Sequence, residues 1–168
     1  YDIVLISVST FFAELIWEMF NALILHFTNY APLWSTPGKT VYLIYVGYNL
    51  EIALFFSIAS IILLNSLPID KNKKIFGLSN RKIIPFFWGI ICVFIEIILY
   101  FVGLLKWDYF WWRWPHVYLI AFVYIFPWFL VVNTYDRLSL KKKISGTIII
   151  TLSAIILHIL FVVIFKWI

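Results

Sequence analysis

Charged residues are scarce in this chain. Only 12% of its 168 residues are Asp, Glu, Lys or Arg, whereas 64% are hydrophobic and the mean hydropathy is +1.00. A soluble globular domain is about one-quarter charged, so this sequence lacks the polar surface that such a domain exposes to water. Cysteine is also scarce. Cys92 is the only cysteine, so no disulfide can form within the chain. These shortages predict an integral membrane protein.

Long apolar runs account for most of the chain. A helix needs roughly 20 residues, at about 1.5 Å each, to cross about 30 Å of hydrocarbon. Five segments meet this requirement, which predicts an all-α, multi-pass transmembrane bundle that forms a single domain over residues 1–168. The expected helices cover approximately residues 3–27, 40–66, 83–106, 116–134 and 145–167. The first run lacks the basic start of a signal peptide and carries two glutamates, so it is expected to be a transmembrane helix.

Basic residues are concentrated in two of the predicted connections. Nine of the 13 Lys and Arg residues lie in residues 67–82 and 135–144. Membrane proteins carry such clusters on the cytoplasmic side, so the N-terminus is expected inside and the C-terminus outside. Indole rings favour the headgroup region, and this orientation places six of the nine tryptophans at the outer interface. These are Trp34, Trp107, Trp111, Trp112, Trp114 and Trp167.

The net charge of +5 does not indicate a nucleic-acid partner. The basic residues flank apolar runs, where Lys and Arg contact lipid headgroups, so membrane lipids are the expected partners.

The sequence also contains an internal repeat. The start of the second expected helix, Val41–Ile44, reads Val-Tyr-Leu-Ile, as does the start of the fourth, Val117–Ile120. Small and polar residues recur in the first and third helices with the same spacing of 3, 4, 4 and 3: Ser7, Thr10, Glu14, Glu18 and Asn21, then Gly89, Cys92, Glu96, Tyr100 and Gly103. This pattern predicts two tandem helical hairpins, formed by helices 1–2 and 3–4, followed by a fifth helix.

All four glutamates lie within predicted spans. A carboxylate at mid-bilayer costs a few kcal/mol, so intramembrane glutamates are candidates for function. Residues at helical spacing share one face, and these polar faces predict a cavity that opens toward the outer leaflet. The candidate catalytic residues are Glu14, Glu18, Glu51, Glu96 and His158. The candidate substrate-binding residues are Asn21, Asn49, Tyr48, Tyr100 and Trp17.

Clustered carboxyls suggest acid–base chemistry. Burial disfavours the charged form of a carboxyl, and two close carboxyls do not both ionise easily. One neutral and one ionised glutamate would form an acid–base pair that can protonate a carbon–carbon double bond of an isoprenoid, while aromatic faces stabilise the cation. The sequence therefore favours a long apolar lipid as the ligand. No metal or other cofactor is expected, because the Glu-x-x-His pairs of di-metal bundles are absent.

Two parts of the sequence resemble known families. The chain length, the five expected helices, the tryptophans and the stretch Tyr30–Pro37 resemble the tryptophan-rich sensory (translocator) proteins. The order of Glu96, the Trp/Tyr-rich connection at Trp107 and Pro127 resembles the integral membrane carotenoid cyclases and hydratases, which also have repeated helical hairpins. That second resemblance implies an isoprenoid-type substrate. The Pro-x-Glu-Glu motif of those cyclases does not occur here, so no catalytic residue is carried over.

Two other functions use the same residues. A proton-linked small-molecule transporter would use the glutamates as titrating sites. A non-catalytic subunit of a larger membrane complex, or a homo-oligomer, would use the polar helix faces as contacts with its partners. Glutamates that face into the bundle would favour a ligand site, whereas glutamates that face outward would favour a subunit.

Overall fold

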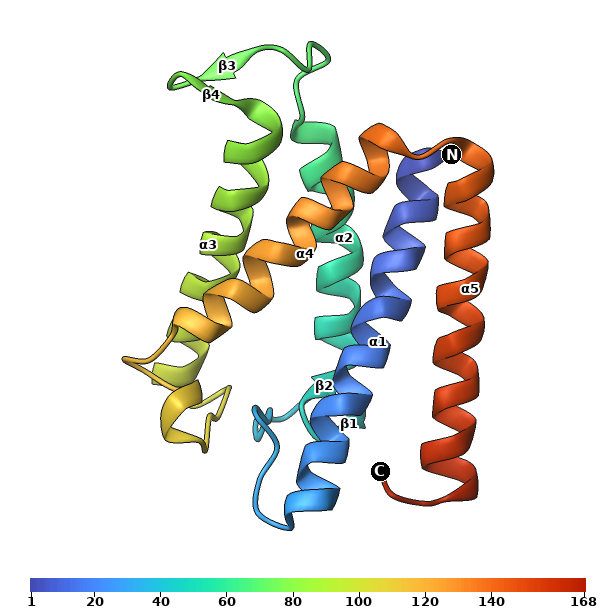
Figure 1. Ribbon diagram of the computed structural model, residues 1–168. Helices are drawn as coiled ribbons and strands as arrows, with labels where there is room; N and C mark the ends of the chain where they lie inside the picture. Colours follow the sequence, from blue (N-terminus) through green and yellow to red (C-terminus); the bar gives the residue numbers. More distant parts are fainter.

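Five helices form a bundle in the computed structural model, which describes residues 1–168 (Figure 1). The helices are α1 (Asp2–Thr28), α2 (Leu50–Ser66), α3 (Asn80–Phe101), α4 (Tyr118–Arg137) and α5 (Leu140–His158). A π-helical segment, η2 (Ile159–Ile164), continues α5, and a short 3-10 helix, η1 (Phe110–Trp112), precedes α4. Four of the helices are long and apolar enough to cross a membrane, whereas α2 has 17 residues. The predicted all-α membrane bundle is confirmed.

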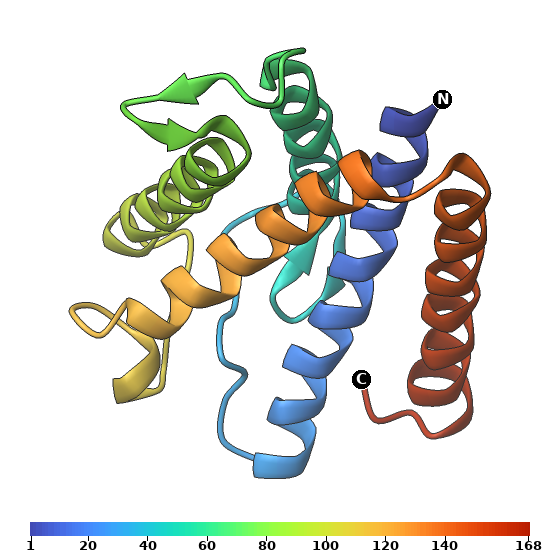
Figure 2. The same ribbon diagram turned by 45° about the horizontal axis from the view of Figure 1, so that its top comes forward.

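Helix α1 lies at the centre of the packing, between α2 and α5, while α3 packs along α4. In both ribbon views α4 is steeply tilted and crosses in front of α2 (Figures 1 and 2). Polar contacts join α1 to α5, because the hydroxyls of Ser9 and Thr147 lie 2.8 Å apart and Lys143 pairs with Asp2 at 2.5 Å. The two helices of each predicted hairpin, α1 with α2 and α3 with α4, are neighbours. The sequence repeat itself stays a prediction.

The predicted start of the second helix was wrong, because α2 begins at Leu50 rather than near residue 40. The preceding residues instead form a hairpin of β1 (Leu43–Tyr45) and β2 (Tyr48–Asn49). Tyr and Val favour extended backbone, and the Asn49 side chain caps α2 by accepting the Ile52 N–H at 2.9 Å. The hairpin turn packs closely on α1, since a Cβ at Gly47 would lie 2.5 Å from the Asn21 amide nitrogen.

The ends of the other helices differ from the predictions by a few residues. Helix α3 ends before residue 106 because Gly103 adopts a left-handed conformation with φ 78°. Helix α5 begins before residue 145 because Ser139 provides an N-terminal cap, accepting the Lys142 N–H at 3.5 Å. Near its C-terminal end the helix widens into η2.

Both basic connections lie at the same end of the bundle as the N-terminus, and the C-terminus lies at the opposite end (Figure 1). The first connection contains the hairpin of β3 (Lys74–Ile75) and β4 (Leu78–Ser79). The buried amide of Asn80 holds it by donating to the carbonyl oxygens of Asp70, Lys71 and Lys73 at 3.0, 3.3 and 2.5 Å. Arg81 links it to α4 through Asp136 at 2.7 Å.

Helices α3 and α4 lie close together at Gly89. A Cβ placed there would lie 2.7 Å from the Cα of Ile125, a distance that side chains do not reach without a backbone shift. Gly89 is therefore the position that lets α4 lie against α3 along its tilted path.

We expect Gly89→Ala to lower the stability of the protein by about 1–3 kcal/mol, because the added methyl group forces α3 and α4 apart. Thermal unfolding of the purified protein in detergent, followed by circular dichroism, measures this change. Gly146→Ala is the matched control: a Cβ at Gly146 meets no neighbour, so alanine should stabilise α5 by up to about 1 kcal/mol. Equal melting temperatures for the two variants would contradict the close approach.

Candidate functional site

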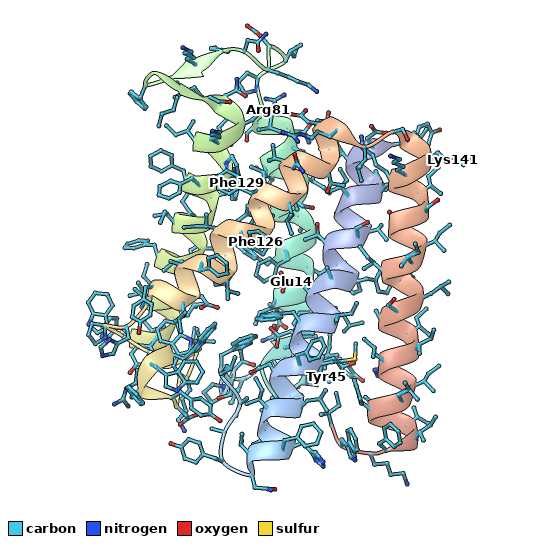
Figure 3. The ribbon with its side chains drawn as sticks, in the orientation of Figure 1. Glu14, Tyr45, Arg81, Phe126, Phe129 and Lys141 are labelled. Carbon is cyan, nitrogen blue, oxygen red and sulfur yellow. The ribbon has the colours of Figure 1, made fainter.

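A cavity of about 440 Å³ lies between α1, α2 and α4. Fourteen of its 20 lining residues are hydrophobic, and its polar lining is dominated by three glutamates: Glu14, Glu18 and Glu96. Figure 3 shows Glu14 at mid-height of the bundle, between α4 and α1. The structure therefore brings together three of the four glutamates that the sequence analysis selected, and they face into the bundle.

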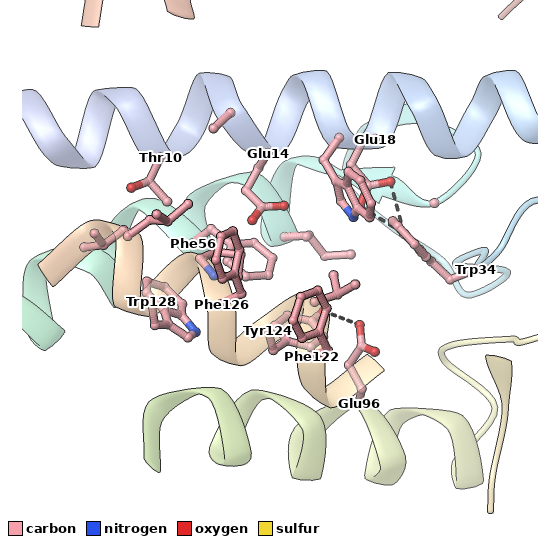
Figure 4. Close-up of a pocket in the computed structure, with 18 of the residues that line it drawn as sticks. Thr10, Glu14, Glu18, Trp34, Phe56, Glu96, Phe122, Tyr124, Phe126 and Trp128 are labelled. Atoms are coloured by element: carbon pink, nitrogen blue, oxygen red, sulfur yellow. Dashed lines mark hydrogen bonds between the residues drawn. The ribbon is translucent and has the colours of Figure 1, made fainter. Parts of the chain in front are cut away.

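The three carboxyls differ in their hydrogen-bond partners (Figure 4). Both oxygens of Glu18 accept the indole N–H of Trp34, at 3.0 and 3.1 Å. Glu96 accepts the hydroxyl of Tyr124. The Glu14 carboxyl points into the cavity, and no protein group donates to it. Glu14 is thus the carboxyl that remains available to a ligand. No three of the His, Cys, Asp and Glu side chains are grouped so that they could hold a metal ion.

Aromatic side chains form two stacks in the cavity wall. Trp34 lies between Trp17 and Trp112, with ring centroids 6.1 and 5.9 Å apart and planes within 25°. The second stack places Phe56 between Tyr124 and Trp128, with centroids 6.1 and 6.2 Å apart. All six residues line the cavity. The faces of such rings carry partial negative charge and attract cations.

The position of Trp34 depends on Asn21, which is 1% exposed on α1. The Asn21 side-chain oxygen accepts the N–H groups of Leu33 and Trp34 at 2.8 and 3.3 Å, and its nitrogen donates to the Trp34 carbonyl oxygen at 2.8 Å. Asn21 does not line the cavity. The sequence analysis placed Asn21 among the substrate-binding residues, whereas the structure shows it positioning a residue that lines the cavity.

The cavity opens sideways between α1 and α4. Its lining includes exposed apolar residues on both helices: Ala13 and Trp17 on α1, and Phe122, Phe126 and Leu130 on α4. The side chain of Phe122 is 64% exposed. Because these residues lie on apolar spans, the opening faces the same surroundings as the outer surface of the bundle. A molecule dissolved in hydrocarbon could therefore enter without crossing a polar surface.

His158 does not join the glutamates. No residue of α5 lines the cavity, and His158 instead places its Nδ1 2.6 Å from the hydroxyl of Tyr45. The expectation of one cavity shared by all candidate residues was wrong here, because spacing along a helix defines a face but not the neighbour that this face meets. Tyr48 is fully buried outside the cavity, and its hydroxyl has no hydrogen-bond partner. Tyr100 also lies outside, stacked on Trp107 with centroids 4.7 Å apart.

Glu51 lies in a second cavity of about 330 Å³ that adjoins the first. It is exposed in the first turn of α2, where it accepts the Thr40 hydroxyl at 2.6 Å and the Val41 N–H at 2.9 Å. Asn49 lines the same cavity, while its side-chain oxygen caps α2. These two candidates therefore lie together, away from Glu14 and Glu18.

The sequence analysis missed five of the six aromatic residues that form the two stacks. It treated Trp34 and Trp112 as interface anchors, and it did not select Phe56, Tyr124 or Trp128. A signal for Tyr124 was present, since the internal repeat aligns it with Tyr48, which was selected. The stacks themselves join residues far apart in the sequence, and no local pattern indicates them.

Residues 1–163 match a family model described as an uncharacterized membrane protein family. An uncharacterized protein of Archaeoglobus fulgidus is 39% identical over 152 residues, which cover 90% of this chain and 72% of that protein. No solved structure matches the chain. The match and the four spanning helices together show an integral, multi-pass membrane protein.

We expect Asn21→Leu to destabilise the protein by about 2–4 kcal/mol, because it leaves two buried N–H groups and one carbonyl without partners. It should also change the near-ultraviolet circular dichroism, since Trp34 loses its fixed position between Trp17 and Trp112. Asn65→Leu is the matched control, because Asn65 is exposed and bonds only to Ile61 of its own helix. If both variants unfold at the temperature of the parent, Asn21 does not hold the connection.

Proposed function

The chain belongs to this uncharacterized membrane protein family, and we propose that its main cavity binds a long apolar lipid of the isoprenoid or carotenoid kind and modifies it by acid–base chemistry. The observation that carries the proposal is the combination of an apolar, aromatic cavity with three inward-facing glutamates. The cavity walls suit a hydrocarbon chain, while the carboxyls suit proton transfer.

The sideways opening supports a ligand that comes from the bilayer. The rim residues on α1 and α4 are apolar, so the lipid would exchange one hydrocarbon environment for another. A proton-linked transporter for a water-soluble molecule would need a polar route to an end of the bundle, and the lining of this cavity favours the lipid over such a substrate. The inward orientation of Glu14, Glu18 and Glu96 likewise favours a ligand site over a partner-facing surface.

The proposed reaction begins at Glu14, which has no protein partner. Its carboxylic acid donates a proton to one carbon of a double bond, and the π electrons form the new C–H bond. A carbocation remains on the neighbouring carbon, where the faces of the two aromatic stacks stabilise it. The carboxylate of Glu18 or Glu96 then removes a proton from an adjacent carbon, which restores a double bond at a new position. Return of that proton to Glu14 completes the cycle. His158 and Glu51 carry no step.

We also propose that the bundle is a single transmembrane domain with its N-terminus in the cytoplasm. Both basic connections share one end of the bundle with the N-terminus, as the positive-inside rule requires for this orientation. Glu18 and Trp34 then lie in the outer half of the membrane.

Proton transfer to carbon can be detected without knowledge of the product. We expect the protein to incorporate deuterium into geranylgeraniol, a C20 isoprenoid alcohol, when the two are incubated in D2O and the lipid is analysed by mass spectrometry. Glu14→Gln should lower the rate by about 100-fold or more, because the amide cannot supply the proton. Binding of the lipid should change little, since the apolar walls remain.

Asp108→Asn is the control for this experiment, because Asp108 pairs with Lys106 at 2.7 Å outside the cavity. Its rate should equal that of the parent. Binding without deuterium incorporation would disprove the acid–base half of the proposal, and the absence of any binding would disprove both halves.

A further inference from the structure

The connection between α2 and α3 ends in the β3–β4 hairpin, whose turn consists of Phe76 and Gly77. In both ribbon views the hairpin lies at the basic end of the bundle and its turn points outward on the side of α3 (Figures 1 and 2). Helix α3 begins directly after β4, at Asn80, and its 22 residues extend about 33 Å, close to the thickness of about 30 Å of hydrocarbon. The hairpin is therefore attached at the level where this span leaves the hydrocarbon.

The hairpin has one apolar face and one polar face. Cross-strand partners in an antiparallel pair project from the same face. Ile75 is paired with Leu78, whereas Lys74 is paired with Ser79, so the aliphatic side chains share one face and the polar side chains share the other. Leu78 is 58% exposed, which leaves much of the apolar face uncovered by the chain.

Phe76, at the turn, is 90% exposed, so its ring makes almost no contact within the chain. Phe76 and Gly77 both have positive φ, at 50° and 79°. Two-residue turns with positive φ at both positions favour Asn, Asp or Gly, and a bulky residue at such a φ strains the backbone. The ring therefore adds no stability through contacts of its own chain, and its position indicates a contact outside the chain.

A buried network holds the hairpin in this position. Asn80 is 0% exposed and donates to three carbonyl oxygens of the connection. Arg81 donates to the Pro68 carbonyl oxygen at 2.9 Å and to Asp136 of α4 at 2.7 Å. Lys71 also pairs with Asp136, at 3.0 Å. The exposed turn is thus held in a fixed orientation relative to α3 and α4.

Three lysines beside the hairpin are free of ion pairs within the chain. These free lysines are Lys73, Lys74 and Lys82, and all three are exposed. The connection contains only one acidic residue, Asp70. Exposed lysines next to apolar side chains suit the surface of a membrane that contains anionic lipids, because the lysines attract the headgroups while the apolar groups enter the interface.

We propose that the β3–β4 hairpin binds the surface of the bilayer that the bundle spans, with Phe76 and the apolar face at the boundary of the hydrocarbon and the free lysines against anionic headgroups. The position of the hairpin favours lipid as its partner. It points outward from α3, and this helix exposes Phe86 and Phe87 along a span that lipid surrounds. The contact does not depend on what the main cavity binds.

Nitroxide labels measure which face of the hairpin enters the lipid. Cys92 is the only cysteine, so a Cys92→Ala background accepts one label at Leu78→Cys or, as the matched control on the polar face, at Lys74→Cys. The full chain is placed in nanodiscs of phosphatidylcholine and phosphatidylglycerol. Collisions of the label with oxygen, which concentrates in hydrocarbon, are compared with collisions with a water-soluble nickel chelate. We expect oxygen to dominate at Leu78 and the chelate at Lys74, and Phe76→Ser should lower the oxygen contribution at Leu78.

A second test needs no cysteine substitution. Trypsin cleaves after exposed lysines, so contact with lipid should protect Lys73 and Lys74. We expect Phe76→Ser to speed cleavage there about tenfold in the same nanodiscs, as the loss of one buried aromatic side chain predicts. Its cleavage after Arg137, an exposed residue of the other basic connection, should equal that of the parent and is the internal control. Nanodiscs of phosphatidylcholine alone should protect the parent less, because they lack anionic headgroups.

The outcomes separate the parts of the proposal. Chelate collisions that dominate at both labels, or equal cleavage of the parent and Phe76→Ser, would place the hairpin in water and overturn the proposal. Few collisions with either reagent at Leu78 would show that a protein surface, such as a second copy of the chain, covers the apolar face, and would overturn it as well. Equal protection in the two kinds of nanodisc would disprove the contact between the lysines and anionic headgroups.

Discussion

The side-chain amide of Asn21 is the contact on which the rest of the site depends. It satisfies two backbone N–H groups and one carbonyl of an irregular connection that has no helix of its own to satisfy them. Within a membrane such groups need partners inside the protein. By holding Leu33 and Trp34 against α1, this single amide fixes the indole that bonds to Glu18 and that separates Trp17 from Trp112. A residue that does not line the cavity thereby sets the shape of its aromatic wall.

A second constraint acts on the opposite side of the cavity. Gly89 lets α4 lie close against α3, and α4 then leaves its partner at a steep tilt instead of packing along α1. The space that this tilt leaves between α1 and α4 is the cavity, and its open side is the side that α4 does not close. Carboxyls that would be costly against lipid are thus enclosed by aromatic rings, while the entrance remains apolar. The site therefore lies where α1 and α4 diverge from each other.

Much of the fold could be predicted because hydropathy and charge act locally. Apolar runs define spans, and basic clusters define one end of the bundle, so α1, α3, α4 and α5 were found within a few residues. Helical spacing also placed Glu14 and Glu18 on one face, and this face lines the cavity. The hairpin before Leu50 was missed because its residues are as apolar as those of a helix. The contacts that accompany the extended form are tertiary, such as the fit of Gly47 against Asn21 and Trp34. His158 was misplaced because the rotation of α5 about its axis is set by contacts with α1 and Tyr45 that leave no local pattern.

The β1–β2 hairpin has a consequence for how the protein is made. During synthesis, residues 40–66 form a run long enough to enter the membrane as a helix, yet in the finished protein the run is a helix only from Leu50. The hairpin packs against α5, which is synthesised after it, through Tyr45 and His158 and through Tyr48 and Ala154 of one apolar cluster. Insertion and folding are therefore separate events for this segment, and the second is complete only when α5 has arrived. A helix that lines no part of the cavity thus completes the packing of the hairpin whose turn residue, Gly47, lines it.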